Sequence, residues 1–208
     1  MKFKKLIFLI LIGVLAMALV ACSSNDVNDL TDDNNNPSGS ETNFSLVDRM
    51  LSDYGIEGEH RFFEVGIDEA LQLLEDETFD GILYFGFPDC PWCQVAVPII
   101  HEASQQTNTD IFYVSRRHEI RDAEGWEEWD IEMAWWLDEQ IEMNWIYDEG
   151  GEPYRPNIFV PQVIHLRNGT VIDDHRGTFE GNDPLIPLTP EQHEGLLEIY
   201  TRILSAVK

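Results

Sequence analysis

Positive charge is scarce in this sequence of 208 residues. It has 13 lysines and arginines against 39 aspartates and glutamates, which gives a formal net charge of -26 at pH 7. Beyond residue 21 the only lysine is Lys208, and the other positive side chains are arginines. Nucleic acids and anionic lipid surfaces are repelled by such a chain, so the composition argues against both as binding partners.

Cysteine is also rare, because the chain has only Cys22, Cys90 and Cys93. No second Cys-x-x-Cys pair exists, so a zinc site built on residues 90 and 93 would need two further ligands. The three histidines considered for that role are more typical of surface or core positions: His101, His118 and His165. We therefore expect no metal ion and no other cofactor, with a zinc half-site as the alternative.

Long apolar runs are missing except at the N-terminus. Residues 6–21 are apolar and uncharged and follow three lysines within the first five positions. The run is shorter than the ~20 residues of a membrane-spanning helix and ends in small residues, as a signal peptide does. Leu19-Val20-Ala21-Cys22 resembles the lipobox of bacterial lipoproteins, in which the cysteine receives the lipid and the leader is removed.

We therefore expect residues 1–21 to be a signal peptide and Cys22 to carry a lipid. The protein would then be extracytoplasmic and anchored to the bacterial cell membrane. The alternative is an uncleaved signal anchor with an incidental cysteine. Residues 23–43 contain three apolar side chains and no aromatic one, so we expect 22–43 to be a lipidated flexible tether. Residues 44–208 are the size of one domain with a substantial core.

Strands and helices alternate in the first half of this domain. Apolar and aromatic runs predict strands, and apolar residues at helical spacing predict the helices between them. Such alternation indicates a parallel sheet built from βαβ units. The predicted strands are 61–65, 81–87 and 110–114, and the predicted helices are 44–55, 67–76 and 91–105.

The second half predicts a hairpin and a final helix. Strands at 162–167 and 170–174 are separated by Asn168-Gly169, the strongest two-residue hairpin signal, because both positions need positive φ. Near the C-terminus, Thr189 fits a helix N-cap with proline at the first helical position and Gln192 completing a capping box.

The pair Cys90-Pro91-Trp92-Cys93 stands at the start of the predicted helix 91–105. The first thiol would lie beside unpaired backbone N–H groups and the positive end of the helix dipole, which favour a thiolate. The second thiol would lie one turn further on, close enough to form a disulfide with the first.

The surroundings of this pair resemble those of the thioredoxin superfamily. Pro98 follows Cys93 by five residues, where thioredoxins have a helix-kinking proline, and Val160-Pro161 opens a strand as their cis-proline does. Asn168-Gly169 follows Pro161 at the distance found in thioredoxins, and Gly177 stands where that family ends its last strand. The resemblance implies an α/β thioredoxin-like fold with a central mixed sheet flanked by helices over residues 60–207. A lipoprotein with Cys-Pro-aromatic-Cys also resembles the bacteriocin-transport accessory branch.

The resemblance implies a role for each of these residues. Cys90 would attack substrate disulfides, Cys93 would resolve the mixed disulfide, and Val160 with Pro161 and Trp92 would bind the substrate. Two departures from the family stand out. Asp89 replaces a tryptophan and should disfavour the Cys90 thiolate. The strand 81–87 lacks the family's buried aspartate, and Tyr84 is its only polar side chain.

Residues 115–159 form a long insertion before the cis-proline strand, and we expect it to be helical. An apolar stripe lies on one helical face, with acidic residues on much of the remainder. The stripe predicts an amphipathic helix packed on the sheet; the alternative is a lid or groove wall beside Cys90. The stripe consists of Trp126, Trp129, Met133 and Trp136, and the acidic residues are Glu127, Glu128, Asp130, Glu132, Asp138, Glu139 and Glu142.

These patterns together predict a membrane-anchored thiol-disulfide oxidoreductase that acts on protein thiols and disulfides. It would exchange electrons with a membrane or soluble redox partner, in either direction. The alternative is a non-catalytic thioredoxin-like accessory module for a secretion or transport system.

Overall fold

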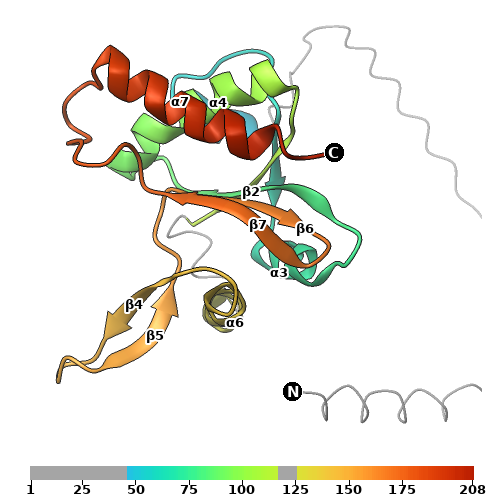
Figure 1. Ribbon diagram of the computed structural model, residues 1–208, viewed down its shortest axis with the longest axis vertical. Helices are drawn as coiled ribbons and strands as arrows, with labels where there is room; N and C mark the ends of the chain where they lie inside the picture. The colour runs from blue at the N-terminus through green and yellow to red at the C-terminus, as the bar shows by residue number, and fades with distance from the viewer. Residues whose placement is uncertain (1–45, 117–125) are drawn as a thin grey trace, which may run out of the picture. The chain divides into compact units, whose positions relative to one another are not determined.

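The computed structural model describes residues 46–116 and 126–208, which all lie in one compact unit, residues 42–208 (Figure 1). The predicted leader, Cys22 and the whole predicted tether lie outside the described residues. Within the two described ranges, none of the helices has the length and apolar character needed to cross a membrane.

Five strands form a mixed central sheet, as predicted. The sheet has the order β1-β3-β2-β6-β7. The first three strands of that order run parallel, β6 runs antiparallel to β2, and β7 runs antiparallel to β6. The strands are β1 (Phe62–Val65), β2 (Asp80–Gly86), β3 (Ile111–Ser115), β6 (Gln162–Arg167) and β7 (Thr170–Arg176).

Strand β2 occupies the centre of this sheet, between β3 and β6. Every residue from Gly81 to Gly86 is buried, as expected for a continuous apolar run covered on both faces. Tyr84 lies opposite Tyr113 of β3 and Val163 of β6. The carboxyl end of β2 leads directly into the loop that carries Cys90.

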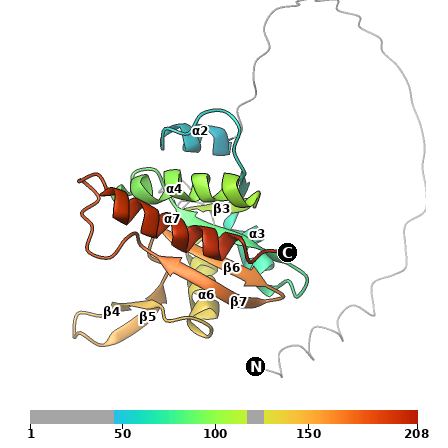
Figure 2. The same cartoon turned by 45° about the horizontal axis from the view of Figure 1, so that its top comes forward.

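Helices cover both faces of the sheet (Figures 1 and 2). One face packs against α2 (Leu46–Ser52), α4 (Pro91–Thr107) and α7 (Pro190–Leu204), which share one apolar core. The opposite face packs against α3 (Ile67–Glu75) and α6 (Trp126–Asp138), which contribute to a second core. The α/β architecture with a mixed sheet flanked by helices is therefore confirmed.

Two local signals also have the predicted geometry. Asn168 and Gly169 have φ values of 52° and 69°, and they join β6 to β7. At the start of α7, the Thr189 hydroxyl accepts from the Gln192 backbone N–H at 3.3 Å, and the Gln192 side chain accepts from the Thr189 N–H at 2.9 Å.

The insertion is only partly helical, which corrects the sequence prediction. After α6 the chain forms a hairpin of β4 (Asn144–Tyr147) and β5 (Pro153–Asn157), which lies beside α6 (Figure 1). The Asp148 carboxylate accepts from the backbone N–H groups of Gly150 and Glu152 at 2.8 and 2.9 Å and so fixes the turn. The prolines of β5 also disfavour helix there.

The predicted apolar stripe packs into the core. Met133 is fully buried, and Trp129 and Trp136 are partly buried beside it. The side chain of Trp126 lies outside the described residues. Asp130, which the sequence placed on the acidic outer face, is instead buried and forms an ion pair with Arg116.

Candidate redox site

Cys90 is the N-cap residue of α4, at the end of the short loop that follows β2. Its φ and ψ are -83° and 118°, and Pro91 stands at the start of the helix, where a missing N–H costs nothing. The Cys90 sulfur accepts a hydrogen bond from the backbone N–H of Cys93 at 3.3 Å. The sulfur therefore fills the position that a capping oxygen usually occupies.

This position changes the acidity of Cys90. A hydrogen bond from the Cys93 thiol, with backbone N–H groups of Cys93 and Trp92, lowers the pKa of Cys90 from 9.0 to about 7 against the opposing effect of burial. The sequence predicted that Asp89 would disfavour the Cys90 thiolate. Asp89 is not among the main causes of the shift, and the pKa of Cys90 falls despite its presence. A larger share of Cys90 is therefore ionised near neutral pH than of an ordinary thiol.

Cys93 lies one turn along α4 and behaves in the opposite way. Its side chain is fully buried, and the hydrogen bond to Cys90 together with burial raises its pKa well above the ordinary value. Both cysteines are free thiols in this structure. Both thiols are buried, but only Cys90 lines a surface hollow; the pair thus combines a thiol of lowered pKa at the edge of that hollow with a fully buried thiol of raised pKa.

Val160 and Pro161 lie against the Cys90 sulfur. The peptide bond between them is cis, as the resemblance implies, and the Val160 carbonyl oxygen lies 3.9 Å from the sulfur. The carbonyl of Pro161 accepts from the Gly177 N–H at 2.8 Å, which ties this loop to the end of β7. Two predicted site segments 70 residues apart therefore meet.

A hollow of about 350 Å³ opens beside Cys90. Trp92 and Phe159 line it and stay 45% and 43% exposed, so two aromatic side chains share this hollow with the Cys90 sulfur. Cys93 and Pro161 are not among its lining residues. The lining residues are Phe87, Asp89, Cys90, Pro91, Trp92, Arg116, Asn157, Ile158, Phe159 and Val160.

Several of these lining residues had no role predicted from the sequence, and four of them lie outside the Cys-x-x-Cys loop. Asn157, Ile158 and Phe159 belong to the insertion, so its last segment is a wall of the site although α6 contributes none of the lining. The sequence signal that could have predicted their place in the site is that they directly precede Val160. Arg116 has no such signal, because its position depends on the register of β3.

Arg116 joins the insertion helix to the site. Its guanidinium pairs with the Asp130 carboxylate of α6, and both side chains are less than 5% exposed. Its backbone N–H donates to the Gly86 carbonyl at 2.9 Å, which extends the contact between β2 and β3. The positive charge at the hollow is therefore neutralised by a buried partner.

Buried tyrosines surround the inner side of Cys93. The rings of Tyr84 and Tyr113 stack at 5.3 Å, and the hydroxyl of Tyr113 lies 3.3 Å from that of Tyr54 and 3.3 Å from the Gly86 carbonyl. Tyr200 of α7 donates to the Gly177 carbonyl at 3.4 Å. Burial raises the pKa of Tyr54, Tyr84 and Tyr200, so these hydroxyls stay protonated.

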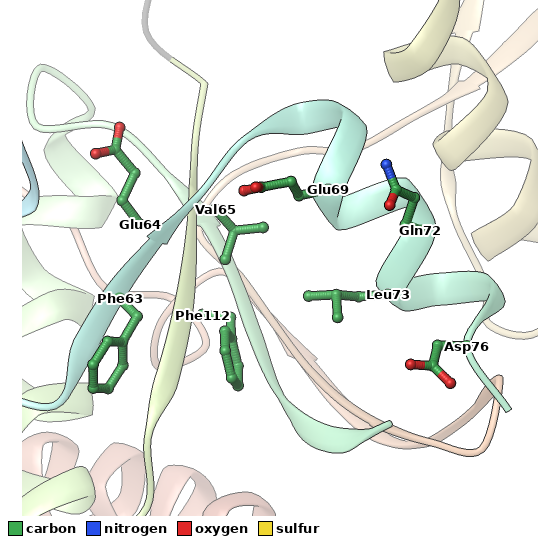
Figure 3. A pocket seen from close by; sticks show the side chains of 8 residues that line it. All are labelled: Phe63, Glu64, Val65, Glu69, Gln72, Leu73, Asp76 and Phe112. Atoms are coloured by element: carbon green, nitrogen blue, oxygen red, sulfur yellow. The ribbon is translucent and has the colours of Figure 1, made fainter. Parts of the chain in front are cut away.

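A second hollow, of about 460 Å³, lies between α3 and the β1–β3 edge of the sheet (Figure 3). Leu73 and Phe112 face its interior, and carboxylates stand around it (Figure 3). Burial and the neighbouring Glu69 raise the pKa of Glu64 there. No thiol lines this hollow, so it does not share the chemistry of Cys90. The lining is Phe63, Glu64, Val65, Glu69, Gln72, Leu73, Asp76 and Phe112.

The candidate histidines do not gather around the cysteines. His165 is fully buried in β6 and contacts the Asp80 carboxylate at 2.8 Å, and His101 of α4 stacks on Phe62 at 6.4 Å. His118 lies outside the described residues. In the part of the chain that the structure describes, no three His, Cys, Asp or Glu side chains are grouped so as to hold a metal ion.

Neither models of known protein families nor curated proteins give a match to this sequence.

Proposed function

We propose that this protein is a thiol-disulfide oxidoreductase whose redox pair is Cys90 and Cys93. The observation that carries the proposal is the contrast between the two thiols. Cys90 caps a helix, borders a hollow and has a pKa of about 7, whereas Cys93 is fully buried with a raised pKa. A nucleophile that is ionised at neutral pH and a protected second thiol are the two parts that thiol-disulfide exchange needs.

The arrangement of elements supports a thioredoxin-like fold for the domain. The strand order β1-β3-β2-β6-β7, the helix α4 after the central strand and Pro98 within that helix agree with the resemblance found in the sequence. Gly177 has a φ of 83° at the end of β7 and binds the Pro161 carbonyl, next to Cys90. The insertion that contains α6 and the β4–β5 hairpin would distinguish this domain from the thioredoxin-like fold that it resembles.

The proposed reaction has two exchange steps. The Cys90 thiolate attacks one sulfur of a client disulfide and displaces the other as a thiolate, which forms a mixed disulfide. Cys93 then gives up its proton and attacks the Cys90 sulfur, which forms the Cys90–Cys93 bond and releases the second client thiolate to take up a proton. The client gains two electrons and the pair loses two; the reverse steps oxidise a client.

The site supports an extended polypeptide as substrate. The Val160 carbonyl beside the Cys90 sulfur offers an acceptor for a substrate backbone N–H, as in strand addition. Trp92 and Phe159 present apolar surface on either side for substrate side chains. No cofactor is required, because the electrons reside in the two sulfurs.

We further propose that the protein works outside the cytoplasmic membrane, anchored by a lipid on Cys22 after removal of residues 1–21. An extracytoplasmic position supports a role in forming, breaking or rearranging disulfides of exported proteins. The redox partner would be a membrane or soluble protein that restores the pair.

Trapping of mixed disulfides tests this function. Cys93→Ser should accumulate covalent complexes between Cys90 and client proteins, because the resolving thiol is gone. Cys90→Ser, the matched control, should trap none. Complexes are detected on non-reducing gels and mapped to Cys90 by mass spectrometry. Equal trapping by both variants would contradict the assigned roles, and trapping by neither would favour the non-catalytic accessory module.

A further inference from the structure

Tyr84 places a hydroxyl at the carboxyl end of the central strand. A Cβ on Gly86 would come within 2.2 Å of the Tyr84 hydroxyl oxygen, so this oxygen lies against the bare backbone of Gly86. Only a glycine at residue 86 leaves room for it. The hydroxyl is thereby held next to the loop that carries the cysteines.

This hydroxyl is fully buried and makes no hydrogen bond of normal geometry to any residue in the described ranges. The neighbouring hydroxyl of Tyr113, in contrast, contacts both Tyr54 and the Gly86 carbonyl. Burying a hydroxyl without a partner opposes folding, so an unpaired one next to a reactive site is a candidate for a functional role.

Cys93 is the reactive group near this hydroxyl. The two side chains share one apolar core, and the Tyr84 hydroxyl acts to lower the pKa of Cys93 while burial and Cys90 raise it. Tyr54 and Tyr200 also lie near Cys93, since a charge on that sulfur raises the pKa of both; Tyr113 stacks on Tyr84. These groups are neutral hydroxyls, from β2, β3, α7 and the loop after α2.

We infer that Tyr84 is a positioning residue that donates its hydrogen bond to the Cys93 thiolate while Cys93 resolves the mixed disulfide. This inference rests on the proposed function. In the dithiol state the protonated Cys93 sulfur is a weak acceptor, and the hydroxyl makes no hydrogen bond of normal geometry. When Cys93 loses its proton, the sulfur becomes a strong acceptor in the core that it shares with Tyr84, and Tyr84 keeps its own proton.

The two steps can be measured separately with an aromatic disulfide, dithiobis(nitrobenzoate). One molecule is added per reduced full-length Cys22→Ser protein, which has no thiols other than Cys90 and Cys93, in a stopped-flow spectrometer. Attack by Cys90 releases the first coloured thiolate, and resolution by Cys93 releases the second. The two phases therefore report the two sulfurs.

Tyr84→Phe should slow the second phase and leave the first within two-fold of wild type. Losing a hydrogen bond to a charged group raises a pKa by about one to two units, so the pH profile of the second phase should move up by that amount. The more basic thiolate is also the better nucleophile, so the rate at pH 7 should fall about three- to ten-fold.

Tyr113→Phe is the matched control, because it removes a hydroxyl from the stacked partner ring but not the one that acts on Cys93. It should leave both phases within two-fold of wild type, and Tyr84→Phe should melt within a few degrees of wild type. The inference is overturned if Tyr84→Phe leaves the second phase unchanged, slows both phases equally or does not fold. It is also overturned if the control Tyr113→Phe slows the second phase as much as Tyr84→Phe does. A wild-type protein that releases no first thiolate would instead refute the proposed function.

Discussion

At the scale of single residues, the acidity of Cys90 depends on its place in the helix rather than on its charged neighbour. The sulfur sits where backbone N–H groups converge, and these groups together with the Cys93 thiol outweigh burial. Asp89 is adjacent in sequence, yet it does not reverse this shift. The Cys93 thiol, together with the backbone N–H groups at the start of α4, therefore sets the acidity of Cys90.

The pH dependence of alkylation measures this directly. Iodoacetamide should label Cys90 with a midpoint near pH 7, because only the thiolate reacts and the folded-state pKa lies about two units below 9.0. Below pH 6 the rate should fall about ten-fold per pH unit. Cys93 should stay unlabelled in the folded protein, which peptide mapping will show.

Asp89→Asn is the control for that measurement, and it should move the midpoint by less than about half a pH unit. A wild-type midpoint above about 8.5, the value of an ordinary thiol, would contradict the capping account.

At the scale of elements, α6 is held to the site by a buried ion pair. Asp130 of α6 neutralises Arg116, whose backbone continues from β3 and whose side chain borders the hollow. Removing one partner of a buried pair leaves an uncompensated charge in the core, which costs far more than the pair contributes.

Asp130→Ala should therefore lower the free energy of unfolding by about 3–5 kcal/mol. Glu132→Ala, on the exposed side of the same helix, should change it by less than about 0.5 kcal/mol. Urea denaturation compares the two variants. Similar losses in both would show that the ion pair does not anchor the helix.

The sequence predicted those elements whose signals are local. The apolar run of β2, the Asn168-Gly169 turn and the Thr189 cap each depend on residues within a few positions, and each formed as predicted. The β4–β5 hairpin was missed although Asp148 begins a turn with two glycines, because its aromatic and acidic surroundings were interpreted as helix.

Features that depend on distant contacts could not be predicted. The cysteine pair and Val160 are found from motif spacing, but their meeting at 3.9 Å needs the whole sheet. In the sequence, nothing distinguishes Asp130 from the exposed acidic residues of α6. Its burial depends on Arg116, which follows β3 and pairs with it only in the folded chain. The tyrosines around Cys93 come from separate elements, so their cluster exists only in the folded chain.

At the scale of the whole molecule, the proposed anchor would confine the redox site to the outer face of a membrane. If Cys22 carries the lipid, Cys22→Ser should abolish incorporation of labelled fatty acid and leave an unprocessed precursor. Gel mobility and radiolabelling measure both effects. Normal processing in that variant would refute the lipoprotein proposal without affecting the redox chemistry.

The reduction potential of the Cys90–Cys93 pair tests the central claim most directly. The full-length protein is equilibrated in glutathione buffers of graded ratio, quenched in acid and analysed by mass spectrometry. A redox pair should form an intramolecular disulfide within minutes, and the reaction should be reversible. The oxidised fraction should follow a single two-electron transition, for which a ten-fold change in the equilibrium constant corresponds to about 30 mV. Thiols that stay reduced at every ratio, or a glutathione adduct on Cys90 that Cys93 never displaces, would contradict the proposed function.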